Sequence, residues 1–101
     1  MKPYRLLDEA EAELKEQVAY FDRESAGLGD RFVADVEAII RNICEYPDSG
    51  SRLSRSVRKR VLRVFHYNIL YLNEPNEVVV IAVAAHKRRT GYWRKRLRKP
   101  R

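Results

Sequence analysis

Apolar residues recur at helical spacing in the first quarter of the chain. From about residue 9 to residue 24 they fall every three to four positions, at Ala10, Leu14, Val18 and Phe21. This spacing places them on one face and predicts an amphipathic helix. Asp8 is expected to cap its N-terminus, with Glu11 three positions later completing a capping-box-like pair.

A second stretch with the same period follows a break that contains Gly27 and Gly29. Its apolar positions are Phe32, Val36, Ile39, Ile40 and Ile43. The spacing predicts a second helix that reaches about Tyr46, where Pro47 stops it. Because the break is short, we expect the two helices to pack as an antiparallel hairpin.

The second half of the chain changes to β-branched and aromatic residues, which favour strands. The predicted strands cover residues 61–65, 67–72 and 78–83, and a short first strand is predicted earlier, at residues 4–7. Residues 51–56 are polar and turn-like, and the polar segment 73–77 suits a hairpin loop. The run 78–83 is apolar without interruption, so we expect it to be buried on both faces inside the sheet.

The predicted element order is β-α-α-β-β-β, which defines an α+β fold with a helical hairpin packed on a mostly antiparallel sheet. A short C-terminal helix is indicated at about residues 91–97, and it overlaps a basic tail at residues 94–101. With 101 residues the chain has room for one hydrophobic core;. We therefore expect a single domain over residues 1–101.

Charge is distributed unevenly between the two halves. Residues 1–50 hold 6 Lys and Arg against 12 Asp and Glu, whereas residues 51–101 hold 15 against 2. The basic half favours an anionic partner, which could be a nucleic acid, an acidic protein segment or a membrane surface. A basic face that serves only solubility is the alternative.

Several function classes lack their sequence signatures. Gly-rich phosphate loops, the G-x-S-x-G elbow and H-E-x-x-H are missing, and the acidic residues of the helices are expected to face solvent. Cys44 is expected to be a buried, inert thiol, and the two histidines give no ligand set for zinc. We therefore expect no metal and no cofactor. No apolar run is long enough to span a membrane, which predicts a cytoplasmic protein.

Basic residues gather next to two of the predicted strands. Arg58, Lys59, Arg60 and Arg63 lead into or lie on one strand, and His86, Lys87, Arg88 and Arg89 directly follow the last. Strand ends of one sheet can bring such residues together, and this density of cations suits phosphate groups or an acidic peptide. Tyr92 and Trp93 alongside could stack on bases or anchor a protein contact. Alternatively, they only dock the terminal segment on the core.

Four features of the chain belong together: the element order, the strand Tyr67-Asn68-Ile69-Leu70-Tyr71, the apolar strand 78–83 and the segment from Ala84 to Trp93. In combination they resemble the RelE/ParE toxin family of type II toxin–antitoxin systems. In the last segment an aliphatic strand runs into a small residue, His, basic residues and a Tyr-Trp step. The resemblance covers nearly the whole chain. It implies a growth-inhibiting toxin whose partner is an antitoxin with a C-terminal segment that wraps it, covering the basic side of the sheet and apolar surface.

The family has two activities. The RelE-like branch is a ribosome-dependent endoribonuclease that cuts messenger RNA, and Lys59, Arg63, Arg88 and Tyr92 would be its catalytic candidates. The arginine expected after the strand aromatic is replaced by Asn68, and an amide supplies no positive charge to a phosphate. The ParE-like branch, which the chain resembles more closely, is not an enzyme and poisons DNA gyrase.

A third hypothesis is a family member that has lost toxicity and acts as a binding module. If the chain is ParE-like, the resemblance and the basic C-terminus make these residues the candidates for target binding: His86, Lys87, Arg88, Arg89, Tyr92, Trp93, Arg94 and Arg96.

Overall fold

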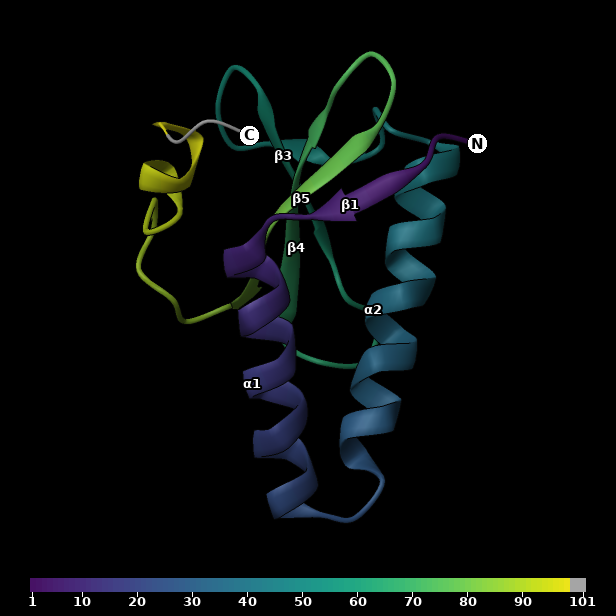
Figure 1. The fold of residues 1–101 in the computed structure, drawn as a ribbon, viewed down its shortest axis with the longest axis vertical. Helices are drawn as coiled ribbons and strands as arrows, with labels where there is room; N and C mark the ends of the chain where they lie inside the picture. Colours follow the sequence, from purple (N-terminus) through teal and green to yellow (C-terminus); the bar gives the residue numbers. More distant parts are fainter. Residues whose placement is uncertain (99–101) are drawn as a thin grey trace.

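The computed structural model describes residues 1–98, and Figure 1 shows a twisted sheet with a long helical hairpin on one side and the C-terminal segment on the other. This arrangement confirms the predicted α+β class and the antiparallel hairpin. Residues 99–101 of the predicted basic tail lie outside the described residues. The elements are β1 (Tyr4–Leu6), α1 (Asp8–Glu24), α2 (Leu28–Glu45), β2 (Ser51–Arg52), β3 (Val57–Val61), β4 (Tyr67–Asn73), β5 (Val78–Ala85) and the 3-10 helix η1 (Arg94–Arg98).

The five strands form one sheet in the order β1-β5-β4-β3-β2. β1 pairs with β5 in parallel, and all other neighbours are antiparallel. β5 is the strand that the apolar run predicted, and it lies inside the sheet as expected, between β1 and β4. Seven of its eight residues are buried.

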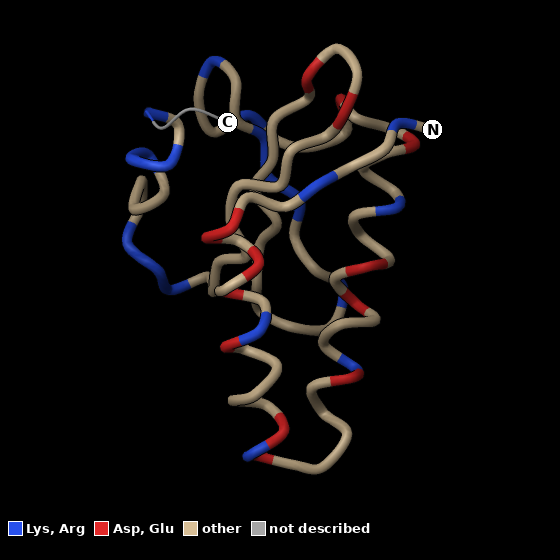
Figure 2. The backbone as a smooth tube through the Cα atoms, viewed as in Figure 1, with Lys and Arg blue, Asp and Glu red and all other residues tan. Residues whose placement is uncertain are grey.

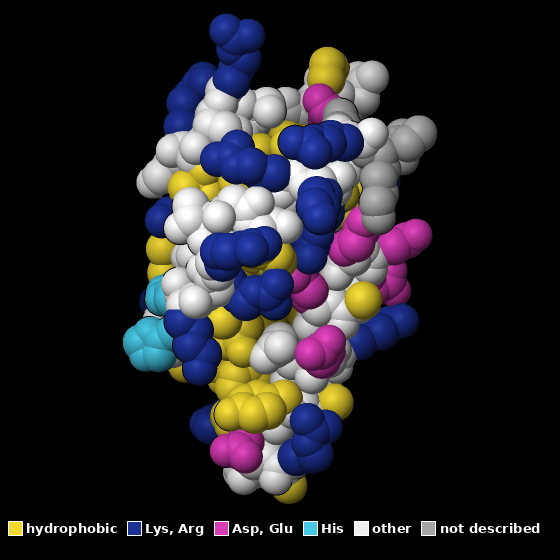
Figure 3. Space-filling view, turned by 90° about the vertical axis from the view of Figure 1, so that its left-hand side faces the viewer, with side chains coloured by type: hydrophobic (Ala, Val, Ile, Leu, Met, Phe, Trp, Pro, Cys, Tyr) yellow, Lys and Arg dark blue, Asp and Glu magenta, His cyan; other side chains and the backbone are white. Residues whose placement is uncertain are grey.

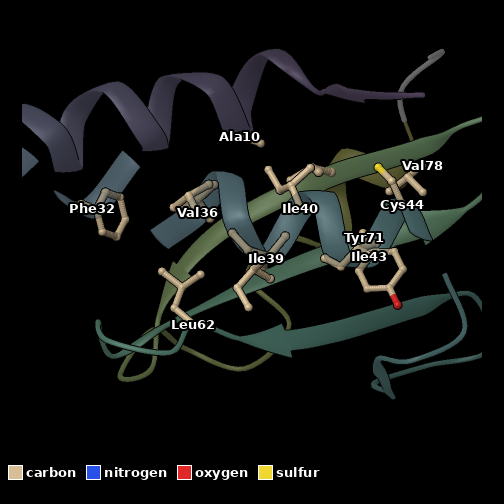
Figure 4. Packing of buried hydrophobic residues seen from close by; sticks show 13 residues of the cluster. Ala10, Phe32, Val36, Ile39, Ile40, Ile43, Cys44, Leu62, Tyr71 and Val78 are labelled. Carbon is tan, nitrogen blue, oxygen red and sulfur yellow. The ribbon is translucent and has the colours of Figure 1, made fainter. Parts of the chain in front are cut away.

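The helical hairpin covers one face of the sheet and forms the larger core (Figure 4). Phe32, Val36 and Ile43 of α2 are at most 2% exposed and belong to one cluster with Tyr71 of β4 and Val78 of β5. Full burial of each such side chain contributes about 1.5–3 kcal/mol. The helical spacing in the sequence therefore identified the core-facing side of α2 correctly.

The opposite face of the sheet is covered by the C-terminal segment. Leu70, Val79 and Ile81 pack there with Trp93, and Leu97 of η1 contacts the same cluster. Trp93 is only 4% exposed. Of the two interpretations given for this aromatic residue, docking of the terminal segment on the core is the one the structure shows.

Three local predictions are corrected by the structure. The strand predicted at residues 61–65 lies earlier, at β3, and residues 62–66 form the bend that leads into β4. Asp8 is the first helical residue and forms no cap hydrogen bond, because Leu7 occupies the cap position. Residues 51–56, expected to be turn-like, include the two-residue strand β2, which pairs with β3.

The C-terminal helix is shorter and begins later than predicted. Residues 91–93 form a turn, and only Arg94–Arg98 are helical, in the 3-10 conformation. No helix within residues 1–98 is long and apolar enough to cross a membrane.

Candidate functional site

Alternation along β3 sorts its three cationic residues onto the two faces of the sheet. Successive strand residues point to opposite faces, and Arg58 and Arg60 are bound on the hairpin side. Arg58 donates to the carbonyl oxygens of Asp48 and Gly50, and Arg60 donates to Asn42 of α2 at 2.8 Å. Lys59 is therefore left on the opposite face, across from Leu70 of β4.

A bulge in the sheet decides which residues at the end of β5 join Lys59. The pairing of β4 with β5 shifts register between Leu70 and Tyr71, so that Leu70 pairs with Ala82 and Tyr71 with Val80. Ile81 and Ala82 consequently both pack in the cluster on the face opposite the helical hairpin. Ala84 lies on this face too, together with Lys59, whereas Val83 packs towards the hairpin;.

The residues after β5 turn back over this face and enclose a pocket. Lys59, Asn68, Arg88 and Tyr92 line it together with Trp93, which forms part of its wall. We call this hollow the cationic pocket. Its full lining is Leu53, Lys59, Asn68, Leu70, Ala84, Ala85, His86, Arg88, Arg89, Thr90, Gly91, Tyr92, Trp93 and Arg94.

The pocket brings most of the candidate residues together but not all of them. Arg63, the fourth nuclease candidate, is exposed in the bend 62–66 and does not line the pocket. Lys87 lines a separate, largely apolar hollow with Tyr20 and Val64. Arg96 is bound to an acidic residue of α1 and is not available as a free cation.

That acidic residue, Glu13, fixes the C-terminal segment. Its carboxylate accepts hydrogen bonds from the backbone N–H of Val83 at 3.0 Å and the hydroxyl of Tyr92 at 2.6 Å, and it forms a two-point ion pair with Arg96 at 2.8 Å. Arg96 also donates to the carbonyl oxygen of Ile81. Glu13 and Arg96 thereby form hydrogen bonds with backbone groups of β5 beyond Val80, where its pairing with β1 ends.

Tyr92 is held in a defined protonation state by this cluster. Burial of the hydroxyl, followed by its hydrogen bond to Glu13, raises the pKa of Tyr92 well above the usual value of a tyrosine;. Arg88 lies over the ring, with its guanidinium carbon 3.9 Å from the ring centroid. The ring therefore supports Arg88 at the pocket wall, while the hydroxyl faces Glu13.

A second carboxylate that sequence reasoning assigned to solvent is also structural. Asp35 of α2 is 8% exposed and accepts hydrogen bonds from the backbone N–H groups of Arg63, Val64 and Phe65, at 2.9–3.3 Å. It thus holds the bend between β3 and β4.

The expectation that the helix acids face solvent is wrong for both Glu13 and Asp35. For Asp35 the sequence did contain a signal of burial: the residue lies three positions after Phe32 and four before Ile39, within the apolar stripe of α2;.

The electrostatic division between the layers follows the sequence. Figure 2 shows acidic residues concentrated on the two helices and basic residues on the C-terminal segment and neighbouring loops. The His66 and His86 rings lie 5.8 Å apart, and both line the apolar hollow next to the cationic pocket. Within residues 1–98, no three His, Cys, Asp or Glu side chains are grouped so that they could hold a metal ion.

These features define a small basic α+β protein in which a helical hairpin covers one face of a sheet and a cationic pocket lies on the other. The family model described as the ParE toxin of type II toxin–antitoxin system, parDE, matches residues 4–90. The chain therefore belongs to the ParE toxin family. No curated protein matches the sequence significantly.

Comparison with solved structures supports the fold. The chain is similar to one from a structure titled "Chromosomal ParDE TA system from P. aeruginosa", with a TM-score of 0.74 and 12% sequence identity. The match covers 84% of this chain and 96% of the other. At this level of identity the likeness concerns the backbone architecture.

Proposed function

We propose that the protein inhibits DNA gyrase and is neutralised by a cognate antitoxin. Membership of the ParE toxin family supports the general role of a type II toxin. The choice of gyrase is supported by the state of Tyr92, whose hydroxyl is bound to Glu13 at 2.6 Å. A residue held in this way is poorly placed to exchange protons with a substrate.

Asn68 supports the same choice. It lines the pocket where a nuclease of this family is expected to present an arginine, and a neutral amide gives little stabilisation to the charge that develops on a phosphate;. Arg63 lies outside the pocket. The remaining cations are suited to binding an anionic surface without cleaving it.

Supercoiling of relaxed plasmid by purified gyrase tests the proposal. The toxin is expected to inhibit supercoiling and to cause cleaved plasmid to accumulate, and addition of the antitoxin from the native operon should reverse both effects. Lys87→Ala and Arg89→Ala should weaken inhibition, whereas Arg31→Ala, which removes an exposed cation from α2, should not. Unchanged supercoiling at excess toxin would reject the gyrase assignment.

A ribonuclease remains the second candidate because Lys59, Arg88 and Tyr92 do line one pocket, with His86 at the same site. This candidate predicts codon-linked cuts in messenger RNA on ribosomes, with cleavage lost in Arg88→Ala. Intact messenger RNA in a translating extract, at toxin concentrations that stop gyrase, would eliminate it.

The proposed antitoxin has an apolar surface available to it. Val64 is 74% exposed and Tyr20 is 45% exposed, and both line the hollow between the end of α1 and the bend 62–66. Exposed apolar groups grouped in this way favour a protein contact. Val64→Asp should therefore weaken capture of the antitoxin in co-purification, and Tyr46→Asp, at an exposed aromatic residue outside this hollow, is the matched control.

A further inference from the structure

The cationic pocket has no acidic residue in its lining. It presents Lys59, Arg88, Arg89 and Arg94, and no Asp or Glu is among the residues that surround it. Figure 3, which views the side of the molecule where the C-terminal segment lies, shows Lys and Arg side chains spread over the upper part of this face. The charged side chains that line the pocket are therefore all cationic;.

The pocket cations differ from the other cations of the sheet in their partners. Arg60 and Arg96 are held by hydrogen bonds or ion pairs inside the protein. Within residues 1–98, the side chains of Lys59, Arg88 and Arg89 form no ion pair with an acidic residue. Arg60 and Arg96 thus stabilise the fold, whereas the pocket cations remain available to bind a ligand.

Lys59 is the pocket cation that a strand of the sheet presents. Its side chain is half-buried on the sheet, across from Leu70, and it shares the pocket with several like charges. Like charges gathered in this way attract an anion.

Arg52, which neighbours the pocket residue Leu53, and Arg55 are exposed cations outside the pocket. They line a second hollow beside β2 and β3 together with Asp48, Glu74 and Arg58, and Arg58 forms an ion pair with Asp48 at 3.6 Å. A polynucleotide backbone carries a charge at every nucleotide, and arginine and lysine are its usual partners. Asn68 adds an amide donor that suits a phosphate oxygen;.

We propose that the cationic pocket binds the phosphodiester backbone of DNA, so that the toxin contacts the DNA held by gyrase as well as the enzyme. This inference rests on the proposed function and extends it. Arg88, supported by the Tyr92 ring, and Lys59, from β3, are the two residues that hold the phosphate.

Fluorescence anisotropy with labelled DNA of 20 nucleotides, single- and double-stranded, tests the proposal directly on the full chain. Lys59→Gln and Arg88→Gln should each weaken binding by about tenfold and lower the slope of log Kd against log salt by about 1. Arg41→Gln removes an exposed cation from α2 and should change affinity less than twofold. Trp93 emission shows whether each variant keeps the C-terminal segment docked.

Competing ligands give the outcomes that would overturn the inference. It fails if the pocket variants behave like Arg41→Gln, if RNA of the same sequence binds while DNA does not, or if polyglutamate binds more tightly than DNA. The gyrase assay separates it from the proposed function. If Lys59→Gln inhibits gyrase as well as the unchanged protein does, the DNA contact is rejected and the gyrase assignment stands. If DNA binding depends on the pocket residues but the protein does not inhibit gyrase, only the gyrase assignment is rejected.

Discussion

Glu13 and Arg96 form a two-point ion pair between the first helix and the last helical turn, with both nitrogen–oxygen distances at 2.8 Å. Their side chains are 15% and 14% exposed, so water screens the pair only weakly;. The same carboxylate binds the Tyr92 hydroxyl. The pair thus holds the segment that forms one wall of the cationic pocket.

Glu13→Gln should therefore undock the C-terminal segment in addition to lowering stability. The substitution leaves the Arg96 charge partly buried without a counterion, so we expect a loss of about 2–3 kcal/mol in the free energy of unfolding. Trp93, the single tryptophan, should report the local change as emission shifted to longer wavelength before global unfolding. Urea titrations followed by fluorescence and by circular dichroism measure the two effects.

The control for this prediction is Glu16→Gln, which removes an exposed carboxylate from the same helix. It should change the free energy of unfolding by less than about 0.5 kcal/mol. Equal effects of Glu13→Gln and Glu16→Gln would show that the ion pair does not stabilise the docked segment.

Asp35→Asn should loosen the bend between β3 and β4. An amide keeps one acceptor oxygen but turns the other acceptor into a donor that opposes the backbone N–H groups of residues 63–65. We expect a loss of about 2–3 kcal/mol, together with faster hydrogen exchange at Val64 and Phe65. Asp30→Asn, at an exposed position of α2, is the matched control. Unchanged exchange at Val64 and Phe65 would contradict this role of Asp35.

The sequence predicted the layers of the fold because apolar periodicity reports burial directly. The stripe of α2 from Phe32 to Ile43 and the unbroken run of β5 both identified core positions correctly. The strand at residues 61–65 was misplaced for a related reason. Four of its five residues are apolar and two of them are β-branched, but the backbone N–H groups of 63–65 bind Asp35 and so are not used in a strand ladder.

The candidate site was only partly predictable because its geometry depends on faces and long-range pairs. Period-2 alternation separates Lys59 from Arg58 and Arg60 once the bounds of β3 are known, but those bounds were misplaced. The bond between Glu13 and Tyr92 joins residues 79 positions apart, and no local pattern encodes it. Arg96 was therefore proposed for target binding, although the structure uses it to hold the fold together.

Cys44 should react slowly with thiol reagents in the native protein. It is 1% exposed, and burial raises the pKa of its thiol, so little of the reactive thiolate is present and reagent access requires opening of the core;. We expect labelling by a disulfide reagent at pH 8 to be at least about a hundredfold slower than in denaturant. Rapid labelling of the folded chain would show that this part of the core opens easily.

Tyr92 should make stability sensitive to alkaline pH. Because the pKa of its hydroxyl is raised in the folded state, the folded protein keeps this proton at pH values where the unfolded chain has lost it. The contribution to stability is therefore complete below pH 10 and declines above it, by up to about 1 kcal/mol per pH unit for this partly buried group.

Tyr92→Phe should be less stable at neutral pH by about 1 kcal/mol, through loss of the hydrogen bond, but should lose less stability between pH 9.5 and 11. Urea denaturation across this range measures the difference, with Tyr46→Phe, at an exposed residue, as the control. Identical pH dependence of the two variants would mean that the hydroxyl of Tyr92 titrates alike in the folded and unfolded chains, and that its bond to Glu13 does not hold the proton.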